Sequence, residues 1–241
     1  MDWFKNWFDS FYYHKLYRHR NTAEAKTFID NIISFIQPEN GSQILDLACG
    51  KGRHSIYLNK KGFDVVGVDL SENSIKEANL SANEKLHFYQ MDMREMTSPI
   101  SFDLVMNMFT SFGYFQHISD NIQVLQGVHT LLKPDGFLVI DFLNATKVIQ
   151  NLVQEETQQV DDIRFTINRV VEDNTVVKKI HVNDQGKEFD FQERVSMFEL
   201  SNFKHMFEQS GFELAHCFGD YKLASFDPAV SDRLILVARK K

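Results

Sequence analysis

Hydrophobic and polar residues follow two periodic patterns along the first two thirds of the chain, one typical of helices and one typical of strands. In Thr22–Ile36 apolar residues recur every three or four positions, and Pro38 with Gly41 then ends this predicted helix. Short β-rich runs predict the strands Gln43–Ala48, Asp64–Asp69, Leu86–Met91, Phe102–Met106 and Phe137–Leu143. Helical patterns start at Arg53 and cover Glu72–Ser81 and Ile118–Leu132. This alternation predicts an α/β, doubly wound, mostly parallel sheet that binds ligands at the carboxyl ends of its strands.

The pattern changes after the fifth strand. Polar turns separate three alternating segments, which are Ile163–Glu172, Val176–Val182 and Phe189–Met197. They predict an antiparallel β insertion, placed over residues 160–198. A helix over Ser201–Ser210 then leads to two further strands, Phe212–Phe218 and Arg233–Ala238. We therefore expect one domain over residues 1–241, with a seven-stranded main sheet.

Residues 1–21 show neither the helical nor the strand pattern and are rich in aromatic and basic side chains. We interpret this segment as an N-terminal arm or lid. An arm that packs permanently on the sheet or mediates a dimer is an equal alternative, and the sequence does not predict the oligomeric state.

Composition narrows the class of protein. The 241 residues are 43% hydrophobic and 24% charged, as in a folded globular chain with one substantial core. The formal net charge of -7 disfavours a nucleic-acid partner. The longest apolar runs are far shorter than the roughly 20 residues that span a bilayer, and the N-terminus lacks a signal-peptide pattern, so we expect a cytoplasmic protein. Cys49 and Cys217 lack metal-site spacing, and no metal is expected.

The clearest local signal is a strand that runs into the glycine turn Gly50-Lys51-Gly52. Its glycines allow a ligand to approach the backbone closely. Ser55 stands where a dinucleotide-binding motif has its third glycine. Asp46 at the strand end would repel a pyrophosphate but suits the ammonium and sugar of an amino-acid nucleoside. We therefore expect a cofactor without phosphates.

Two further acidic residues follow the next two strands. Asp69 stands at about the 20-residue offset where a carboxylate binds ribose hydroxyls. The alternative is that Asp69 or Ser71 caps the following helix. Asp92 could accept a hydrogen bond from an adenine amine, with Met93 beside the ring; taken alone, it fits a helix cap equally well.

These motifs resemble, in order, those of class I S-adenosylmethionine-dependent methyltransferases. The matching segments, within about Thr22 to Asn144, are Asp46–Gly52, Val66–Ser71, Asp92-Met93, Phe102–Val105 and Leu132–Phe137. The resemblance implies S-adenosyl-L-methionine as cofactor. It places Gly50 and Gly52 at the methionine part, Asp69 at the ribose, Asp92 and Met93 at the adenine, and Asn107 and Met108 near the sulfonium. The other implied cofactor-binding residues of this core are Asp46, Ala48 and Leu70. Lys51 and Asp135 depart from the usual pattern.

The segment Leu16–Lys26 and the insertion are also similar to glycine N-methyltransferase and amino-sugar N-methyltransferases. This similarity implies that Tyr13, Tyr17 and Arg20 close over the cofactor, and that Arg20 meets its carboxylate through a charge-assisted bond.

Methyl transfer from a sulfonium needs alignment of the nucleophile and support for the moving positive charge. Phe109, Phe112 and Tyr114 suit the walls of such a site, although they also suit a core. If the nucleophile arrives protonated, Tyr114 and His117 are the nearest candidate catalytic residues. We expect a small-molecule acceptor with a nitrogen or oxygen nucleophile. A nucleic-acid or protein methyltransferase, a noncatalytic cofactor-binding protein and a nicotinamide dehydrogenase are the alternatives.

Overall fold

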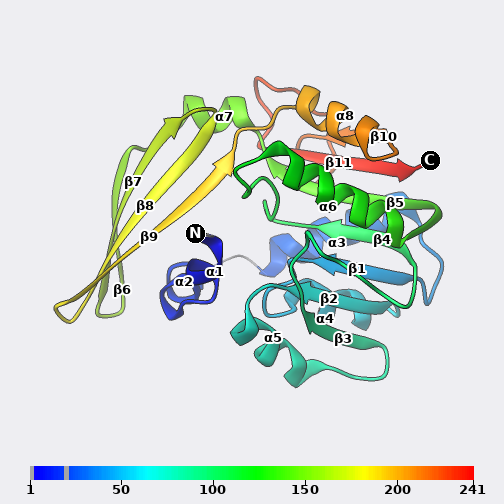
Figure 1. Ribbon diagram of the computed structural model, residues 1–241, viewed down its shortest axis with the longest axis horizontal. Helices are drawn as coiled ribbons and strands as arrows, with labels where there is room; N and C mark the ends of the chain where they lie inside the picture. Colours follow the sequence, from blue (N-terminus) through cyan, green and yellow to red (C-terminus); the bar gives the residue numbers. More distant parts are fainter. Residues whose placement is uncertain (1–2, 19–21) are drawn as a thin grey trace.

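A computed structural model describes residues 3–18 and 22–241. Seven strands form its main sheet, in the order β10-β11-β5-β4-β1-β2-β3 (Figure 1). Their bounds are β1 (Gln43–Leu47), β2 (Asp64–Asp69), β3 (Leu86–Gln90), β4 (Phe102–Asn107), β5 (Leu132–Leu143), β10 (Phe212–Phe218) and β11 (Arg233–Lys240). Strands β1 to β5 are parallel, and β11 runs antiparallel to both β5 and β10. The predicted doubly wound α/β sheet is confirmed.

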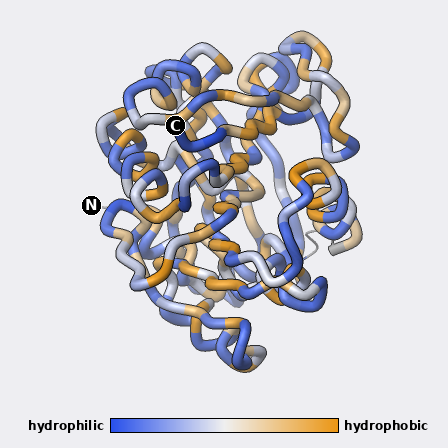
Figure 2. The backbone as a smooth tube through the Cα atoms, turned by 90° about the vertical axis from the view of Figure 1, so that its right-hand side faces the viewer, coloured by the Kyte–Doolittle hydropathy of each residue, from blue (hydrophilic) through white to orange (hydrophobic). Residues whose placement is uncertain are grey.

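Helices cover both faces of this sheet. They are α3 (Thr22–Ile36), α4 (Arg53–Lys60), α5 (Glu72–Ala78) with the 3-10 turn η1 (Asn79–Ser81), α6 (Ile118–Leu131) and α8 (Leu200–Gln209). The short helix α7 (Ala145–Gln150) follows β5. Apolar side chains of α3, α4 and α5 share one core, and those of α6 and α8 share the core on the opposite face. Figure 2 shows apolar segments gathered inside the molecule. No described helix is long and apolar enough to cross a membrane.

The inserted sheet has four antiparallel strands, one more than the sequence pattern indicated. They are β6 (Glu155–Val160), β7 (Ile163–Glu172), β8 (Thr175–Asp184) and β9 (Lys187–Ser196). The first of them, β6, is an edge strand in which only Val160 is buried, so its polar sequence gives no alternating signal. The insertion therefore begins about five residues before the predicted boundary at residue 160.

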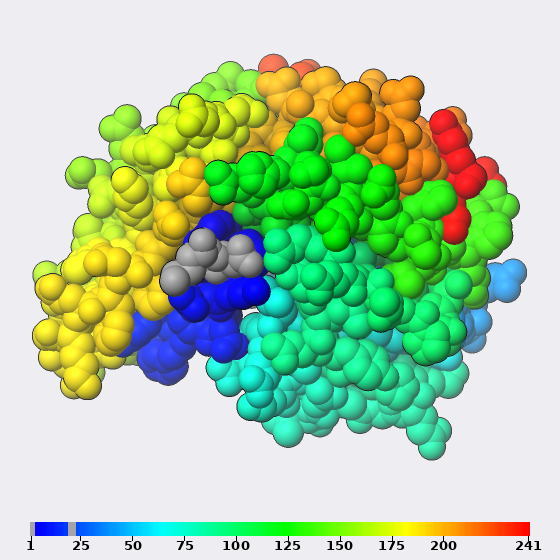
Figure 3. Space-filling view, viewed as in Figure 1, coloured from blue at the N-terminus to red at the C-terminus, as the bar shows by residue number. Residues whose placement is uncertain are grey.

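The N-terminal segment forms two short helices, α1 (Trp3–Phe8) and α2 (Phe11–Leu16). Six-residue helices are too short to show a hydrophobic period. Trp7 is fully buried in a core that the arm shares with the inserted sheet. On the other side, the Asp9 carboxylate accepts hydrogen bonds from Ser71 Oγ (2.5 Å) and from the Asn73 side chain (2.9 Å) at the start of α5. The arm thus bridges the two sheets, as Figure 3 shows.

Because Trp7 is buried in the shared core, we expect it to stabilise the packing of the arm against the inserted sheet. Trp7→Ala should lower the free energy of unfolding by about 3–5 kcal/mol, because it leaves a large cavity between α1 and the inserted sheet. Phe11→Ala is the matched control, since Phe11 is 60% exposed, and it should change stability by less than about 0.5 kcal/mol. Urea unfolding measures both values. Equal stability of the two variants would contradict the shared core.

Candidate active site

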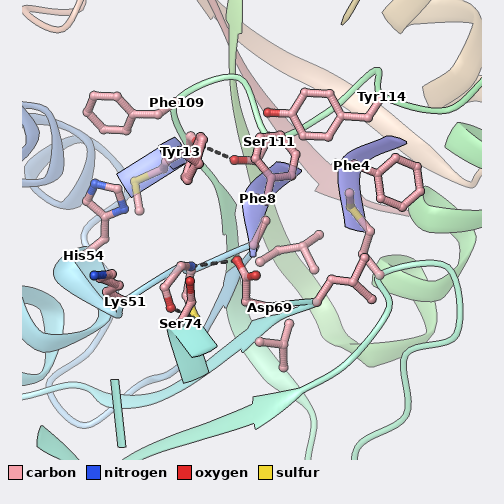
Figure 4. A pocket seen from close by; sticks show the side chains of 18 of the residues that line it. Phe4, Phe8, Tyr13, Lys51, His54, Asp69, Ser74, Phe109, Ser111 and Tyr114 are labelled. Atoms are coloured by element: carbon pink, nitrogen blue, oxygen red, sulfur yellow. Dashed lines mark hydrogen bonds between the residues drawn. The ribbon is translucent and has the colours of Figure 1, made fainter. Parts of the chain in front are cut away.

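A cavity of about 470 Å³ lies at the carboxyl ends of β1, β2 and β4, beneath the arm. It brings together eleven of the residues that the sequence analysis selected: Tyr13, Tyr17, Ala48, Gly50, Asp69, Leu70, Asp92, Met93, Met108, Phe109 and Tyr114. In Figure 4 Asp69 lies on one side, Phe109 and Tyr114 lie on the other, and Phe8 of the arm lies between them. The cavity therefore occupies the edge of the sheet where such folds bind ligands.

Asp69 joins the glycine turn to the start of α5. Its Oδ2 atom accepts a hydrogen bond from the Gly50 backbone (2.7 Å), and its Oδ1 atom accepts one from the Ser71 backbone (2.8 Å). Burial raises the pKa of the Asp69 carboxyl despite these bonds, and nearby Asp9 raises it further. The cap of α5 is Ser71, whose hydroxyl accepts from Ser74 N. Because a carboxylate has about four acceptor sites, Asp69 can still accept hydrogen bonds from a ligand.

The two glycines of the turn differ in role. Gly50 lines the cavity with a positive φ of 55°, and a Cβ at this position would meet nothing within 4 Å. Gly52 is not among the cavity's lining residues. A Cβ on Gly52 would lie 2.6 Å from the Phe88 ring, so packing between α4 and β3 excludes a side chain there. Gly52 thus has a packing role in the structure, and its contact with a cofactor stays a prediction.

Asp46 also lies outside the cavity lining. Its carboxylate is 1% exposed and accepts a hydrogen bond of 2.6 Å from the Ser55 hydroxyl. Ser55, which interrupts the dinucleotide motif, thereby ties α4 to the end of β1. Burial raises the pKa of Asp46 to about 6. In the structure Asp46 supports the glycine turn through Ser55, and its direct role toward a cofactor stays a prediction.

Asp92 and Met93 line the cavity beside β3. The Arg94 guanidinium binds both Asp92 oxygens, with Nε at 3.0 Å and Nη2 at 2.6 Å. Burial raises the pKa of Asp92, but the hydrogen bonds from Arg94 outweigh it, so the net pKa lies below the ordinary value. Arg94 also lies over the Phe115 ring, 4.8 Å from its centroid. The Asp92 carboxylate is therefore held ionised and in a fixed orientation.

Three other expected site residues lie elsewhere. Asn107 is buried, and its amide donates to Leu47 O (3.2 Å) and Ser111 O (3.1 Å), so it ties the loop after β4 to β1. His117 is exposed at the N-cap of α6 and is not among the residues that line this cavity, so its role as a base stays a prediction without support from the geometry. Phe112 is 1% exposed in the core. Arg20 lies outside the described residues.

The structure adds residues that the sequence analysis did not select. Arg53 and His54 line the cavity beside Phe109: the His54 ring stacks on Phe109 at 4.9 Å, and the Arg53 guanidinium lies 5.0 Å from the same ring. From the arm, Phe4, Phe8 and His14 also line it. Within the described part of the chain, His14 Nε2 is buried and has no hydrogen-bond partner. Burial lowers the pKa of His14, and Lys51 lowers it further.

A second cavity of about 450 Å³ adjoins the first. It is lined by Phe8, Glu24, Phe109, Thr110, Tyr114, Glu193, Val195, Tyr221 and Arg233. Phe8, Phe109 and Tyr114 line both cavities and so form a common wall. The arm, the loop after β4, the inserted sheet and β11 all contribute to the second cavity.

Asp141 fixes this common wall from behind. Its fully buried carboxylate accepts hydrogen bonds from Arg233 Nε (2.8 Å), the Tyr221 hydroxyl (3.0 Å) and the Phe109 backbone (2.9 Å). Phe109 and Thr110 both have a positive φ, near 60°, which costs energy for residues with side chains. Thr110 is held there by Arg233 Nη2, at 2.7 Å from its hydroxyl.

No cluster of three or more His, Cys, Asp or Glu side chains that could hold a metal ion occurs in residues 3–18 and 22–241. The polar groups at the first cavity are instead carboxylates, backbone amides and cations, arranged around aromatic and methionine side chains.

The raised pKa of Asp46 predicts a pH-dependent stability. The pKa is about 6 in the folded chain and about 3.9 when unfolded, so the folded state binds more protons between these values. Stability is gained as pH falls through 6 and is lost as pH rises through it. Lowering the pH from 7 to 5 should stabilise the natural chain relative to Asp46→Asn by about 1.4 kcal/mol, measured by urea unfolding. A pH-independent difference would show that Asp46 is solvated.

Comparison with known proteins agrees with this geometry. A family model described as a methyltransferase domain matches residues 38–211. The putative methyltransferase YqeM of Bacillus subtilis (strain 168) is 31% identical, over 84% of this chain and 85% of the relative. Glycine/sarcosine N-methyltransferase of Halorhodospira halochloris is 25% identical, over 91% of this chain and 83% of the relative.

Among solved structures, an S-adenosylmethionine-dependent methyltransferase from Clostridium acetobutylicum ATCC 824 superposes with a TM-score of 0.81 at 21% identity, over 95% of this chain and 96% of that one. That likeness shows the same fold. Because the family model and the Bacillus relative both extend over most of the sequence, the chain belongs to the class I S-adenosylmethionine-dependent methyltransferases.

Proposed function

We propose that this enzyme transfers a methyl group from S-adenosylmethionine, bound in the first cavity, to a small molecule bound in the second. The common wall of Phe8, Phe109 and Tyr114 carries this proposal, because two cavities of suitable size meet there. The acceptor nucleophile is nitrogen or oxygen.

The residues of the first cavity fit the cofactor. Asp69 has acceptor sites for ribose hydroxyls, Asp92 and Met93 suit an adenine, and the open space at Gly50 lets a ligand approach the backbone. Lys51 and Arg53 supply positive charge for a carboxylate on the same cavity. When bound, the cofactor supplies a methyl group on a sulfonium, which is open to in-line displacement. Arg20 stays a predicted contact of its carboxylate, as Tyr13 and Tyr17 stay predicted parts of its cover.

The protein's task is to align the nucleophile and exclude water. Aromatic faces on the common wall support the positive charge that moves during transfer. The Tyr114 hydroxyl donates to the Thr110 backbone oxygen, and this bond fixes the orientation of the ring. We therefore propose that Tyr114 shapes the site with its ring and does not act as the base. Holding the reactants in line can lower the barrier by roughly 7–11 kcal/mol.

Enclosure by the arm and the inserted sheet favours a small acceptor. The second cavity, at about 450 Å³, lies within the size of small-molecule sites. The relative from Halorhodospira halochloris is named as an enzyme of glycine and sarcosine, which are small acceptors. A net charge of -7 also disfavours a nucleic-acid acceptor.

Calorimetry tests the cofactor assignment. The protein should bind S-adenosylmethionine and S-adenosylhomocysteine but not NAD, because Asp46 places negative charge beneath the glycine turn and Ser55 stands where a dinucleotide-binding motif has its third glycine. Asp69→Asn should weaken binding about tenfold or more. The substitution replaces one carboxylate oxygen with an NH2 group, which donates hydrogen bonds and cannot accept one from a backbone N–H or a ribose hydroxyl. Asp64→Asn is the control: Asp64 begins the same strand at its far end, where it pairs with Lys85 at 3.2 Å.

Two results would count against the assignment. Binding of NAD alone would reject the proposed cofactor site. Unchanged affinity of a folded Asp69→Asn variant would restrict Asp69 to its turn-forming bonds with Gly50 and Ser71.

A further inference from the structure

We propose that the methyl acceptor is an amine, and that Glu193 binds its ammonium group in the second cavity and takes up its proton. This inference rests on the proposed function and narrows its acceptor from nitrogen or oxygen to nitrogen.

Glu193 is held in a fixed position at this cavity. It extends from β9, and its side chain is 16% exposed. The Trp7 indole donates to its Oε1 atom at 2.7 Å, and the Tyr17 hydroxyl lies 2.7 Å from Oε1 and 2.9 Å from Oε2. Because the single Tyr17 proton can serve only one oxygen at a time, the carboxylate keeps acceptor sites for a further donor.

Carboxylates stand at and behind this cavity. Glu24 and Glu193 line it, and Asp141 binds the lining residue Arg233. Lys178 lies 3.6 Å from Glu193. An ammonium group can therefore meet the Glu193 carboxylate on the cavity wall, where partial desolvation strengthens their attraction.

Neither cation is placed to bind an anionic acceptor well. The Arg233 guanidinium already donates to Asp141 and to Thr110. Lys178 lies 3.6 Å from Glu193, 4.7 Å from the centre of the Tyr17 ring, and donates to the Tyr17 hydroxyl. Both cations thus act mainly to hold protein groups in place.

The available bases also favour nitrogen over oxygen. The described lining of this cavity has no histidine, so carboxylates are the bases at hand. A carboxylate can accept a proton from an ammonium group far more readily than from an alcohol. The reason is that an alkoxide is a much stronger base than an amine. Aromatic rings at the common wall also favour a cation, because their faces attract positive charge. The ring centroids of Phe8 and Tyr114 lie 5.2 Å apart there.

The chemical step balances with these groups. Glu193 takes one proton from the ammonium, which leaves a lone pair on nitrogen. That lone pair forms the new nitrogen–carbon bond while the carbon–sulfur bond breaks and its electron pair stays on sulfur. The positive charge moves from sulfur to nitrogen, and the proton on Glu193 leaves to solvent as the product departs.

Trp7 gives a direct readout of binding, because its indole donates to Glu193. In a Trp3→Phe background Trp7 is the only tryptophan, and its fluorescence can be titrated in the presence of S-adenosylhomocysteine. The probes are ethanolamine, benzylamine and cyclohexylamine, each with its hydroxyl counterpart: ethylene glycol, benzyl alcohol and cyclohexanol. At least one amine should change the Trp7 emission saturably and bind about tenfold more tightly than its counterpart.

Glu193→Gln tests the carboxylate while keeping an oxygen that can accept from Trp7 and Tyr17. It should weaken the responding amine about tenfold or more and, with that amine as acceptor, lower the formation of S-adenosylhomocysteine from S-adenosylmethionine. The control is Glu188→Gln on the same strand, whose side chain is 63% exposed beside His181. This control should leave amine binding unchanged.

The outcomes separate the two claims. If no amine perturbs Trp7, if the hydroxyl counterparts bind as tightly, or if Glu193→Gln binds the amine normally, the amine inference is wrong. Methylation of a hydroxyl acceptor with normal cofactor binding would overturn only this inference. Failure to bind S-adenosylmethionine would instead overturn the proposed function.

Discussion

The Asp141 carboxylate is the constraint on which both cavities depend. It is fully buried at the end of β5, and its three donors come from the antiparallel strand β11, from the loop after β10 and from the loop after β4. A buried carboxylate is costly unless such partners are present, so loss of any of these donors should destabilise the way the four segments pack. The assembly holds Phe109 and Thr110 in left-handed conformations and thereby positions the wall that the two cavities share.

The arm and the inserted sheet form the other half of the enclosure. They share an apolar core around Trp7, and polar bonds from Trp7 and Tyr17 orient Glu193 at the second cavity. Asp9 connects the same arm to the N-terminus of α5 through Ser71 and Asn73. Ser71 follows Asp69 by two residues in the chain. One short segment thus contributes to the lining of both cavities, which links their positions.

The main sheet could be predicted from sequence because buried parallel strands and amphipathic helices leave strong periodic signals. The same signals were absent from β6, whose side chains are mostly polar, and from the arm, whose helices are too short. At the site, the motif order located the cavity correctly, but motif membership did not show which way each side chain faces. Asp46 and Gly52 belong to the motif yet support it from beneath, through Ser55 and Phe88.

The second cavity could not be predicted in the same way. Glu193, Tyr221 and Arg233 are far apart in the sequence and meet only because β9, the loop after β10 and β11 converge on the loop after β4. Periodicity reports local structure, whereas this convergence depends on how the inserted sheet folds back onto the main one.

The most direct test of the shared wall is a crystal structure of the protein with S-adenosylhomocysteine. We predict that the ribose hydroxyls hydrogen-bond to Asp69 and that the sulfur atom faces the wall of Phe8, Phe109 and Tyr114. A nucleoside bound outside the first cavity, or a sulfur atom that faces away from the second cavity, would contradict the account.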